Sequence, residues 1–410
     1  MRILYLHQYF CTPEGSSGTR SYEFSRRLVA NGHHVDMITS SVNLPDEWKR
    51  PVGFYNLEFE DIYLHICNIN YSNKMNFYQR LKSFEGFAHA ASRIAKSLPR
   101  PDIVFASSTP LTIGIPGIYS AKYHKSPMVF EVRDCWPEIP IALGWLGNPI
   151  LRILAYWLQR RIYRFADHIV ALSPDMKATI IESGVSEYKV SVIPNCSDID
   201  FFKPSSCDLE FRHQLGWPKD AIIAIHPGAM GQVNGLGTIL DAAVRLRDLA
   251  PKVICVLIGD GKERSALEAR KAAEGIDNVI IQGTVPKRQM PRLTAAADIG
   301  LMTVLPIPEL YANSANKFFD YLATGLPIVM NYGGWKAELL RKSGAGLTAP
   351  SGDNDAFAKM IAEFANNKER RRCASLAARE LAVSRFDRNL LTKHLEKIFQ
   401  QVVNGHSPVL

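Results

Sequence analysis

The sequence has no long hydrophobic run: across its 410 residues, no stretch approaches the ~20 apolar residues that a membrane-spanning helix needs. It also begins without the basic segment, apolar segment and small-residue cleavage site of a signal peptide. We therefore expect a soluble or peripheral protein. Hydrophobic residues make up 47% of the chain and charged residues 21%, a balance that argues against disorder. The length favours two domains over one core.

Recognisable metal-ligand spacings are absent as well. The seven cysteines include no Cys-x-x-Cys pair, and the eleven histidines include no His-x-x-x-His spacing. Asp198-Ile-Asp200 imitates a metal-binding acidic pair but falls in a segment that looks like an interdomain linker. We therefore predict reduced cysteines and no metal site.

The formal net charge of +8 is compatible with a polyanion, a phosphorylated substrate or an anionic membrane surface, and selects none of them. We predict no nucleic-acid partner. One segment, Tyr71 to Arg100, concentrates basic residues against the single acid Glu85 and interleaves them with aromatic ones. It could lie on an anionic membrane or pack as a core helix with a solvated basic face. The residues concerned are Lys74, Arg80, Lys82, Arg93, Lys96 and Arg100, with Phe77, Tyr78, Leu81, Phe84 and Phe87, and Arg152, Arg160, Arg161 and Arg164 could extend the patch.

Short apolar runs alternate with helical patterns twice along the chain, which predicts an α/β fold with two Rossmann-like domains facing across a cleft. A change of texture between residues 193 and 220 marks the linker. The predicted strands of the first half are Ile3–Leu6, Val35–Ser40, Asp102–Ala106, Met128–Glu131 and His168–Leu172. Those of the second half are Ala221–Ile225, Val253–Ile258, Val279–Ile281, Ile299–Met302 and Pro327–Met330.

Ligands of open α/β sheets bind at the carboxyl ends of the strands, where two groups of the first half fall. One is a glycine loop before the first helix, which could cradle an anion or be an ordinary turn. It is not Gly-x-Gly-x-x-Gly, which argues against a nicotinamide oxidoreductase. The other is a polar cluster that could bind substrate, or could be an Arg–Asp structural pair with a packed tryptophan. The loop offers Ser16, Ser17, Gly18 and Thr19, and the cluster Arg133, Asp134, Trp136 and Glu138.

The second half offers two further groups. The loop with Gly228, Met230 and Asn234 follows a strand and is either a phosphate cradle or a plain turn. Farther on, Lys317 and Asp320 share a helix face if a helix begins near Ser314. Lysine suits a phosphate, and a carboxylate can accept both hydroxyls of a ribose. The alternative is a surface ion pair between Lys317 and Asp320.

Taken together, these segments resemble the group 1 family of retaining GT-B glycosyltransferases over nearly the whole chain. The segments that carry the resemblance, besides the glycine loop, are Ile193–Asn195, Val256–Gly261, Val279–Gly283, Ala297–Gly300 and Asp320–Pro327. It implies an acceptor domain over 1–200, a donor domain over 201–387 and a last helix, 388–410, that crosses back onto the first domain. It also implies a nucleotide-sugar donor, expected to be a UDP-sugar, with Asp320 on the ribose, the backbone around Gly283 and Val285 on the base, and no metal cofactor.

The chain departs from the family's usual donor clamp. Ala312 stands where the family has glutamate, and the phosphate loop offers Met230 and Asn234 in place of arginine and lysine. Asn316-Lys317-x-x-Asp320-Tyr and Arg133-Asp134-x-Trp-Pro are instead similar to a sub-branch found in bacterial surface-polysaccharide pathways, including fucosamine-type transferases. That similarity implies that Lys317 supplies the positive charge. It also implies a polyprenyl-diphosphate-linked glycan acceptor, in O-antigen or capsule synthesis, and a place on the inner face of the cytoplasmic membrane.

Retaining transfer of this kind needs no covalent nucleophile, since the departing diphosphate can deprotonate the incoming hydroxyl. Lys317, with backbone of Gly18 and Met230, would stabilise the diphosphate, and Arg133 and Asp134 would position donor or acceptor. We expect Asn316 to assist donor binding. The expected acceptor contacts are Ser16, Ser17, Thr19, Trp136 and Glu138. A sugar-nucleotide epimerase of the same shape and a nucleotide-sugar-binding protein without turnover remain open alternatives.

Overall fold

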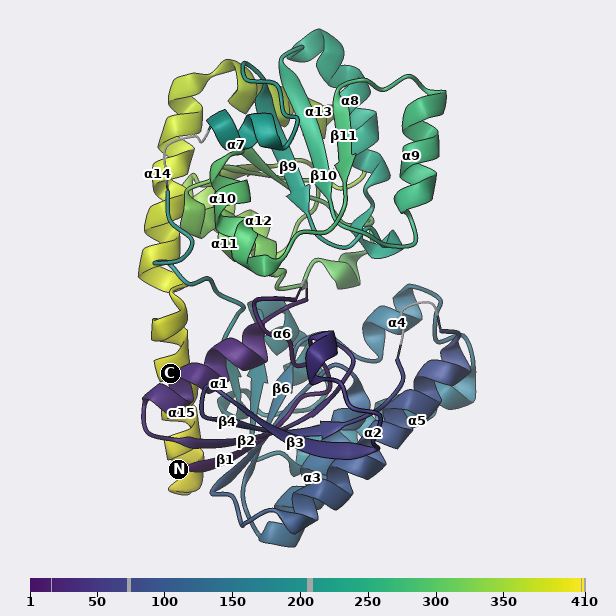
Figure 1. Cartoon of the computed structure of the whole chain (residues 1–410), viewed down its shortest axis with the longest axis vertical. Helices are drawn as coiled ribbons and strands as arrows, with labels where there is room; N and C mark the ends of the chain where they lie inside the picture. The colour runs from purple at the N-terminus through teal and green to yellow at the C-terminus, as the bar shows by residue number, and fades with distance from the viewer. Residues whose placement is uncertain (16, 72–74, 205–208, 407, 409–410) are drawn as a thin grey trace. The chain divides into compact units, whose positions relative to one another are not determined.

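The computed structural model describes residues 1–410 apart from 16, 72–74, 205–208, 407 and 409–410. The chain forms two compact units (Figure 1). Unit 1 comprises Met1–Pro194 with Asn389–Leu410, and unit 2 comprises Asn195–Arg388. Each unit is built on a predominantly parallel sheet, so the predicted α/β class with two Rossmann-like domains is confirmed. Within the described residues, no helix combines the length and apolarity needed to cross a bilayer.

Unit 1 contains an eight-stranded sheet in the order β3-β4-β2-β1-β5-β6-β7-β8. All neighbours pair in parallel except β3, which lies antiparallel to β4 at one edge. The strands are β1 Arg2–Leu6, β2 His34–Ser40, β3 Phe54–Phe59, β4 Ile62–Cys67, β5 Ile103–Ser107, β6 Met128–Val132, β7 His168–Ala171 and β8 Val190–Val192. Every residue of β5, β6 and β7 is buried, as expected for parallel strands covered by helices on both faces.

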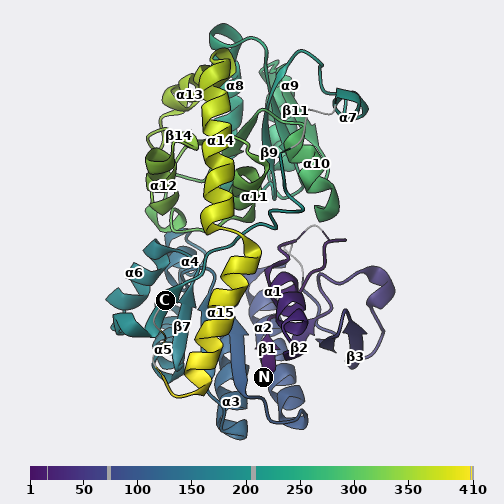
Figure 2. The same ribbon diagram turned by 90° about the vertical axis from the view of Figure 1, so that its left-hand side faces the viewer.

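The helices of unit 1 flank this sheet (Figure 2). They are α1 Arg20–Ala30, α2 Phe77–Ser97, α3 Gly114–His124, α4 Glu138–Ala142, α5 Pro149–Phe165, α6 Pro174–Glu182 and α15 Arg388–Val403. The C-terminal α15 is held against the N-terminal part of the chain: Glu396 bonds His33 at 2.9 Å and Asn31 at 2.8 Å, and the Phe399 ring packs on Phe105.

Unit 2 contains a six-stranded, all-parallel sheet in the order β11-β10-β9-β12-β13-β14. Its strands are β9 Ile222–Pro227, β10 Val253–Ile258, β11 Val279–Gln282, β12 Ile299–Met302, β13 Ile328–Met330 and β14 Gly346–Thr348. Its helices are α7 Leu209–Gln214, α8 Gly237–Leu249, α9 Arg264–Ala273, α10 Met290–Ala295, α11 Asn316–Thr324, α12 Trp335–Ser343, α13 Asn354–Asn366 and α14 Lys368–Arg385. The core between the sheet and α8 and α13 is apolar, with Leu240, Val253 and Phe357 fully buried.

A buried ion pair joins the first turn of α1 to the middle of the unit 1 sheet. Arg20 binds Glu131 of β6 through Nε at 3.0 Å and Nη2 at 2.8 Å, and both side chains are almost wholly buried. Arg20 also donates to the carbonyls of Ile193 and Pro194, and the Ser107 hydroxyl donates to the second oxygen of Glu131 at 2.5 Å. These bonds satisfy both charged groups, which is the condition under which a buried pair is tolerated.

We predict that Arg20→Ala lowers the free energy of unfolding of unit 1 by about 3–5 kcal/mol, because it leaves the Glu131 carboxylate buried without a cation. Urea denaturation measures the loss. The control is Lys177→Ala, which removes a half-exposed partner of Glu187 in the same unit and should cost less than about 1 kcal/mol. Equal stabilities of the two variants would contradict the prediction.

Candidate functional site

In unit 2, the predicted cation Lys317 lies over the start of the loop that contains Gly228, Met230 and Asn234. It is the second residue of α11, whose N-cap Ala315 offers no side-chain cap. The Lys317 ammonium donates to Nε2 of His226, near the carboxyl end of β9, at 2.7 Å. A Cβ placed on Gly228, whose φ is +145°, would lie only 2.8 Å from this ammonium, so a side chain here would displace the lysine and strain the backbone. Lys317, held by His226 above Gly228 at the N-terminus of α11, thus forms a positively charged site, which we call the cationic spot.

Burial sets the protonation of both partners. It lowers the pKa of Lys317 to about 7, so that the ammonium loses its proton within the physiological range. Burial, reinforced by the nearby Lys317 charge, holds the pKa of His226 well below its usual value. The imidazole is therefore neutral and accepts the bond from the lysine without cancelling its charge.

Asp320 is buried and does not pair with Lys317. One of its oxygens accepts from the Ser197 hydroxyl at 2.9 Å, and the other forms an ion pair with Lys287. The alternative of a surface ion pair between Lys317 and Asp320 is therefore wrong. Lys287 lies in the 3-10 turn Lys287–Gln289, a few residues beyond the predicted base-binding residues, and no sequence motif signals its role.

The loop that contains Gly228 and Met230 is hydrogen-bonded to the end of β10 and the turn after it. The Gly228 N–H donates to the Ile258 carbonyl and the Met230 N–H to the Asp260 carbonyl, each at 2.8 Å. The Met230 side chain is itself buried in the core of unit 2. The Met230 N–H, which is expected to face the diphosphate, is thus already engaged within the unit, as is the Gly228 N–H.

The other predicted donor residues lie around this loop. The Asn234 side-chain amide stabilises the loop by donating to the Ala229 carbonyl at 2.6 Å. The backbone carbonyl of Asn234 accepts from the Thr303 hydroxyl. Gly283 is exposed directly after β11, and Val285 is half-buried. Asn316 is half-buried at the first position of α11.

In unit 1, Arg133 makes the same kind of contact as Lys317. It follows β6 and donates through Nη1 to Nε2 of His7, directly after β1, at 2.6 Å. Nδ1 of His7 lies 2.9 Å from the Ser21 hydroxyl. Burial, followed by the charges of Arg133 and Arg20, holds the pKa of His7 well below its usual value. This imidazole is also neutral, and neither histidine had been singled out from the sequence.

Asp134, directly after Arg133, is a half-buried carboxyl group with an altered pKa. Burial raises its pKa to about 6, against an opposing effect of the Arg133 charge. A carboxyl group with such a pKa can accept a proton from a hydroxyl, or return one, near neutral pH.

The predicted acceptor residues fall into two segments of unit 1. Trp136 is half-buried, and Glu138 opens α4 and accepts from Gln159 at 3.1 Å. Ser17 and Gly18 are half-buried before α1, whose N-cap Thr19 is buried and makes no side-chain cap bond. The predicted Ser16 lies outside the described residues.

Among the residues that the structure describes, no three His, Cys, Asp or Glu side chains gather as metal ligands. The linker residue Asp198 instead accepts the backbone N–H groups of Asp200 and Phe201, each at 3.2 Å. Its carboxylate therefore stabilises a turn.

Family models match most of the chain. Residues 17–201 match Glycosyltransferase Family 4, and residues 208–381 match Glycosyl transferases group 1. A protein of Escherichia coli named as a colanic acid biosynthesis glycosyl transferase, WcaI, is 26% identical over 64% of this chain and 66% of its own length. The chain spans about half to two-thirds of the length of the curated relatives it matches.

Solved structures match the fold over nearly the whole chain. A sucrose-phosphate synthase from Thermosynechococcus elongatus superimposes with a TM-score of 0.79 at 16% identity, covering 98% of this chain and 99% of that one. HepE of Anabaena in complex with UDP-glucose superimposes with a TM-score of 0.73 at 18% identity, covering 98% and 100%.

We predict that Asp134→Asn stabilises the protein at pH 8 by up to about 3 kcal/mol and has little effect at pH 4. The native carboxyl group binds its proton more tightly than the unfolded chain does. Stability should therefore fall as pH rises from about 4 to 6, and the asparagine variant should escape this loss. Urea denaturation at both pH values measures the effect, with the exposed Asp61→Asn as control. Parallel pH profiles of wild type and Asp134→Asn would refute it.

Proposed function

This chain belongs to the group 1 glycosyl transferases of GT-B fold, and from that membership we propose that it transfers a sugar from a UDP-sugar to a glycan with retention of configuration. The observation that carries the proposal is the cationic spot of Lys317, His226 and Gly228 at the N-terminus of α11. The complex of HepE with UDP-glucose supports a uridine donor. The name of WcaI supports a glycan acceptor in the synthesis of a bacterial surface polysaccharide.

In this proposal the diphosphate of the donor rests on the cationic spot. Negative charge grows on the diphosphate as the glycosidic bond breaks, and Lys317 and the helix N-terminus stabilise that charge more in the transition state than in the ground state. The departing diphosphate takes the proton of the acceptor hydroxyl on the same face of the sugar, which retains the configuration. No covalent nucleophile and no metal ion is required.

Unit 1 would supply the acceptor side. Asp134 orients a hydroxyl of the donor sugar or acceptor, and Arg133, held by His7, keeps positive charge beside it. Ser17, Thr19, Trp136 and Glu138 are the proposed acceptor contacts. The proposed acceptor is a glycan on polyprenyl diphosphate, as O-antigen and capsule synthesis use, which would bring the enzyme to the inner face of the cytoplasmic membrane.

The donor nucleoside would be held by unit 2. Asp320 is the proposed ribose carboxylate, and the backbone around Gly283 and Val285 the proposed base site. Asp320 and Lys287 are bound to each other in the structure. We therefore propose that the ribose hydroxyls join or displace the Lys287 ammonium at this carboxylate.

We predict that Lys317→Ala lowers turnover at least roughly 100-fold, the scale of losing one preorganised charge donor. Release of UDP from a panel of UDP-sugars measures turnover, and calorimetry with UDP, GDP and ADP measures the preference for a base. Lys252→Ala, at an exposed position of unit 2, is the control and should retain activity. Near-wild-type turnover of Lys317→Ala would refute the assignment, and UDP binding without any turnover would favour a binding protein.

We also predict that UDP binds the wild type about fivefold more weakly at pH 8 than at pH 7. The free Lys317 side chain, with a pKa of about 7, loses most of its charge over this interval, and a bound diphosphate must restore the proton. Calorimetric titrations in buffers of different ionisation enthalpy measure both the affinity and the proton uptake. The dependence should vanish in Lys317→Met, and a wild-type affinity that stays constant from pH 7 to 8 would contradict the prediction.

A further inference from the structure

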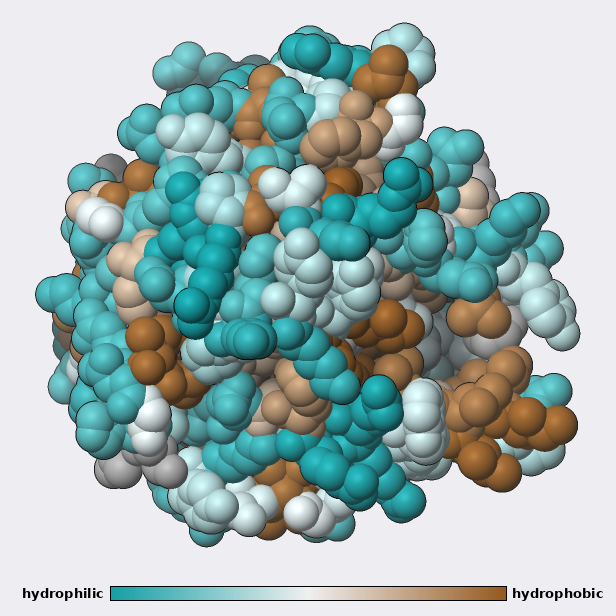
Figure 3. All heavy atoms as spheres, turned by 90° about the horizontal axis from the view of Figure 1, so that it is seen from below, coloured by the Kyte–Doolittle hydropathy of each residue, from teal (hydrophilic) through white to brown (hydrophobic). Residues whose placement is uncertain are grey.

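Helix α5 turns its apolar side toward solvent. Ile150, Ile153, Leu154 and Trp157 follow the i, i+3, i+4, i+7 spacing of a single helix face, and their side chains are between 53% and 69% exposed. In Figure 3, brown residues gather at the right-hand margin, the side on which α5 lies in Figure 1. Apolar stripes of this kind normally face a core, so an exposed one marks an interaction surface.

The opposite side of α5 already serves the core of unit 1. Gln159, Ile162 and Tyr163 are buried, and the Tyr163 ring packs against Phe130 of β6. The exposed stripe is therefore additional to the face that the fold needs, and folding alone gives no reason for it.

The same outward side becomes basic in the second half of the helix. Arg160, Arg161 and Arg164 are exposed, and the Arg161 guanidinium lies over the Trp157 ring at 5.5 Å. Lys122 of α3 lies beside them over the Phe165 ring. Neither α3 nor α5 contains an aspartate or glutamate.

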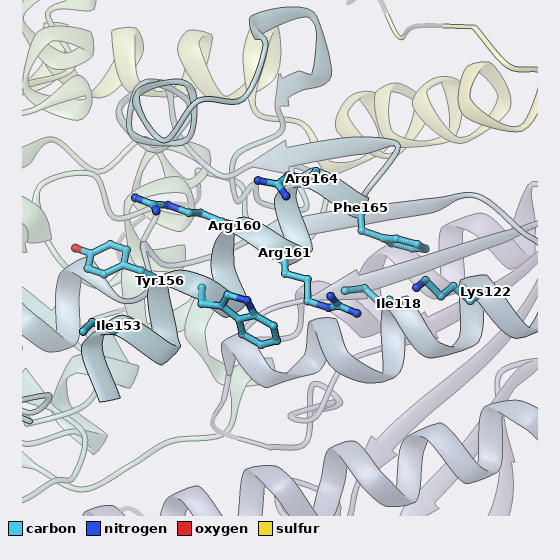
Figure 4. Close-up of a pocket in the computed structure, with 9 residues that line it drawn as sticks. Ile118, Lys122, Ile153, Tyr156, Arg160, Arg161, Arg164 and Phe165 are labelled. Atoms are coloured by element: carbon cyan, nitrogen blue, oxygen red, sulfur yellow. The ribbon is translucent and has the colours of Figure 1, made fainter. Parts of the chain in front are cut away.

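A hollow of about 830 Å³ opens between these two helices. Figure 4 shows Arg161 and Phe165 of α5 beside Ile118 and Lys122 of α3, with Arg160 farther along α5. The hollow thus combines apolar walls with four cationic groups at its rim, since Arg164 lines it too.

The basic and aromatic segment Tyr71 to Arg100 corresponds to a different helix, α2. In α2, Phe87 and Ile94 are buried and the helix packs on α3, and among its described side chains Tyr78 and Leu81 are the exposed large apolar ones. Lys74, one of the predicted cations of that segment, lies outside the described residues. The structure therefore favours the core-helix alternative for most of α2 and places the exposed amphipathic surface on α5.

We propose that α5 and the adjoining part of α3 form a docking surface for an anionic lipid bilayer. Ile150, Ile153, Leu154 and Trp157 would enter the boundary between head groups and acyl chains, while the arginines and Lys122 contact lipid phosphates. A bilayer offers apolar depth and anionic phosphate in adjoining layers, which matches the adjoining apolar and basic halves of α5. A second copy of this chain, docked through the same surface, would place its own α3 and α5 against the arginines. These helices contain no carboxylate that could pair with them.

The proposal deepens the proposed function, because a lipid-linked acceptor requires the enzyme at the bilayer, but lipid binding can be measured without turnover. The full chain is mixed with vesicles of phosphatidylcholine alone or with roughly a third phosphatidylglycerol, and the bound fraction is measured by flotation. We expect binding to the anionic vesicles at low salt and its loss at high salt.

Two variants separate the two halves of the surface. Arg161→Gln/Arg164→Gln should lower the partition coefficient roughly 30-fold, about fivefold for each cation near the membrane. Ile153→Ser/Leu154→Ser should lower it at least roughly tenfold. The charge control is Lys252→Gln/Lys359→Gln and the apolar control Leu376→Ser/Val383→Ser, all at exposed positions of unit 2, and both should bind as the wild type does.

Failure of wild-type binding to anionic vesicles, or wild-type binding by both α5 variants, would overturn the proposal. A dimer in light scattering that Ile153→Ser/Leu154→Ser dissociates would assign the surface to a second copy and overturn it too. UDP affinity, measured on the same samples without vesicles, should be unchanged in all variants. Absence of UDP binding in the wild type would count against the proposed donor site alone, whatever the vesicles show.

Discussion

The buried pair of Arg20 and Glu131 ties together the segments that form the carboxyl edge of the first sheet. Arg20 opens α1 directly after the glycine loop, and Glu131 stands two residues before Arg133. Because the pair is nearly inaccessible to water, it persists only if every charged atom is bonded, and bonds to β5 and to the carbonyls of Ile193 and Pro194 complete it. The positions of the glycine loop, Arg133 and the end of unit 1 thus depend on a single electrostatic arrangement.

Both units use a neutral histidine to hold a cation at the carboxyl end of the first strand. His7 accepts from Arg133, and His226 accepts from Lys317. A carboxylate in the same place would neutralise the cation, whereas a neutral imidazole orients it and leaves its charge for another anion. The desolvation that keeps each histidine neutral also lowers the pKa of Lys317, so orientation is obtained at the cost of a lysine that is only partly charged at pH 7.

Sequence patterns predicted the fold well where strands are buried on both faces. The runs Val253–Ile258 and Ile299–Met302 coincide with β10 and β12, because a parallel strand needs apolar residues throughout. The hairpin of β3 and β4 went unpredicted, since β3 lies at an edge and is largely exposed. The partner of Asp320 could not be predicted either: Lys287 is 33 residues away and belongs to no recognisable motif. Composition likewise cannot tell which aromatic residues of a basic helix face solvent: Phe87 of α2 is buried, whereas Trp157 of α5 is exposed.

The ion pair of Asp320 and Lys287 constrains how unit 2 can receive a nucleoside. Asp320 is 2% exposed and both of its oxygens are bonded, so hydroxyl groups reach it only if Lys287 or its turn shifts. That turn begins two residues after Val285, in the segment proposed to hold the base. A base bound there would contact the segment that carries Lys287. The ribose hydroxyls of the same nucleoside would then donate to Asp320 in place of the Lys287 ammonium. Base and ribose recognition would then be coupled through Lys287, because neither the carboxylate nor the ammonium can be left buried without a partner.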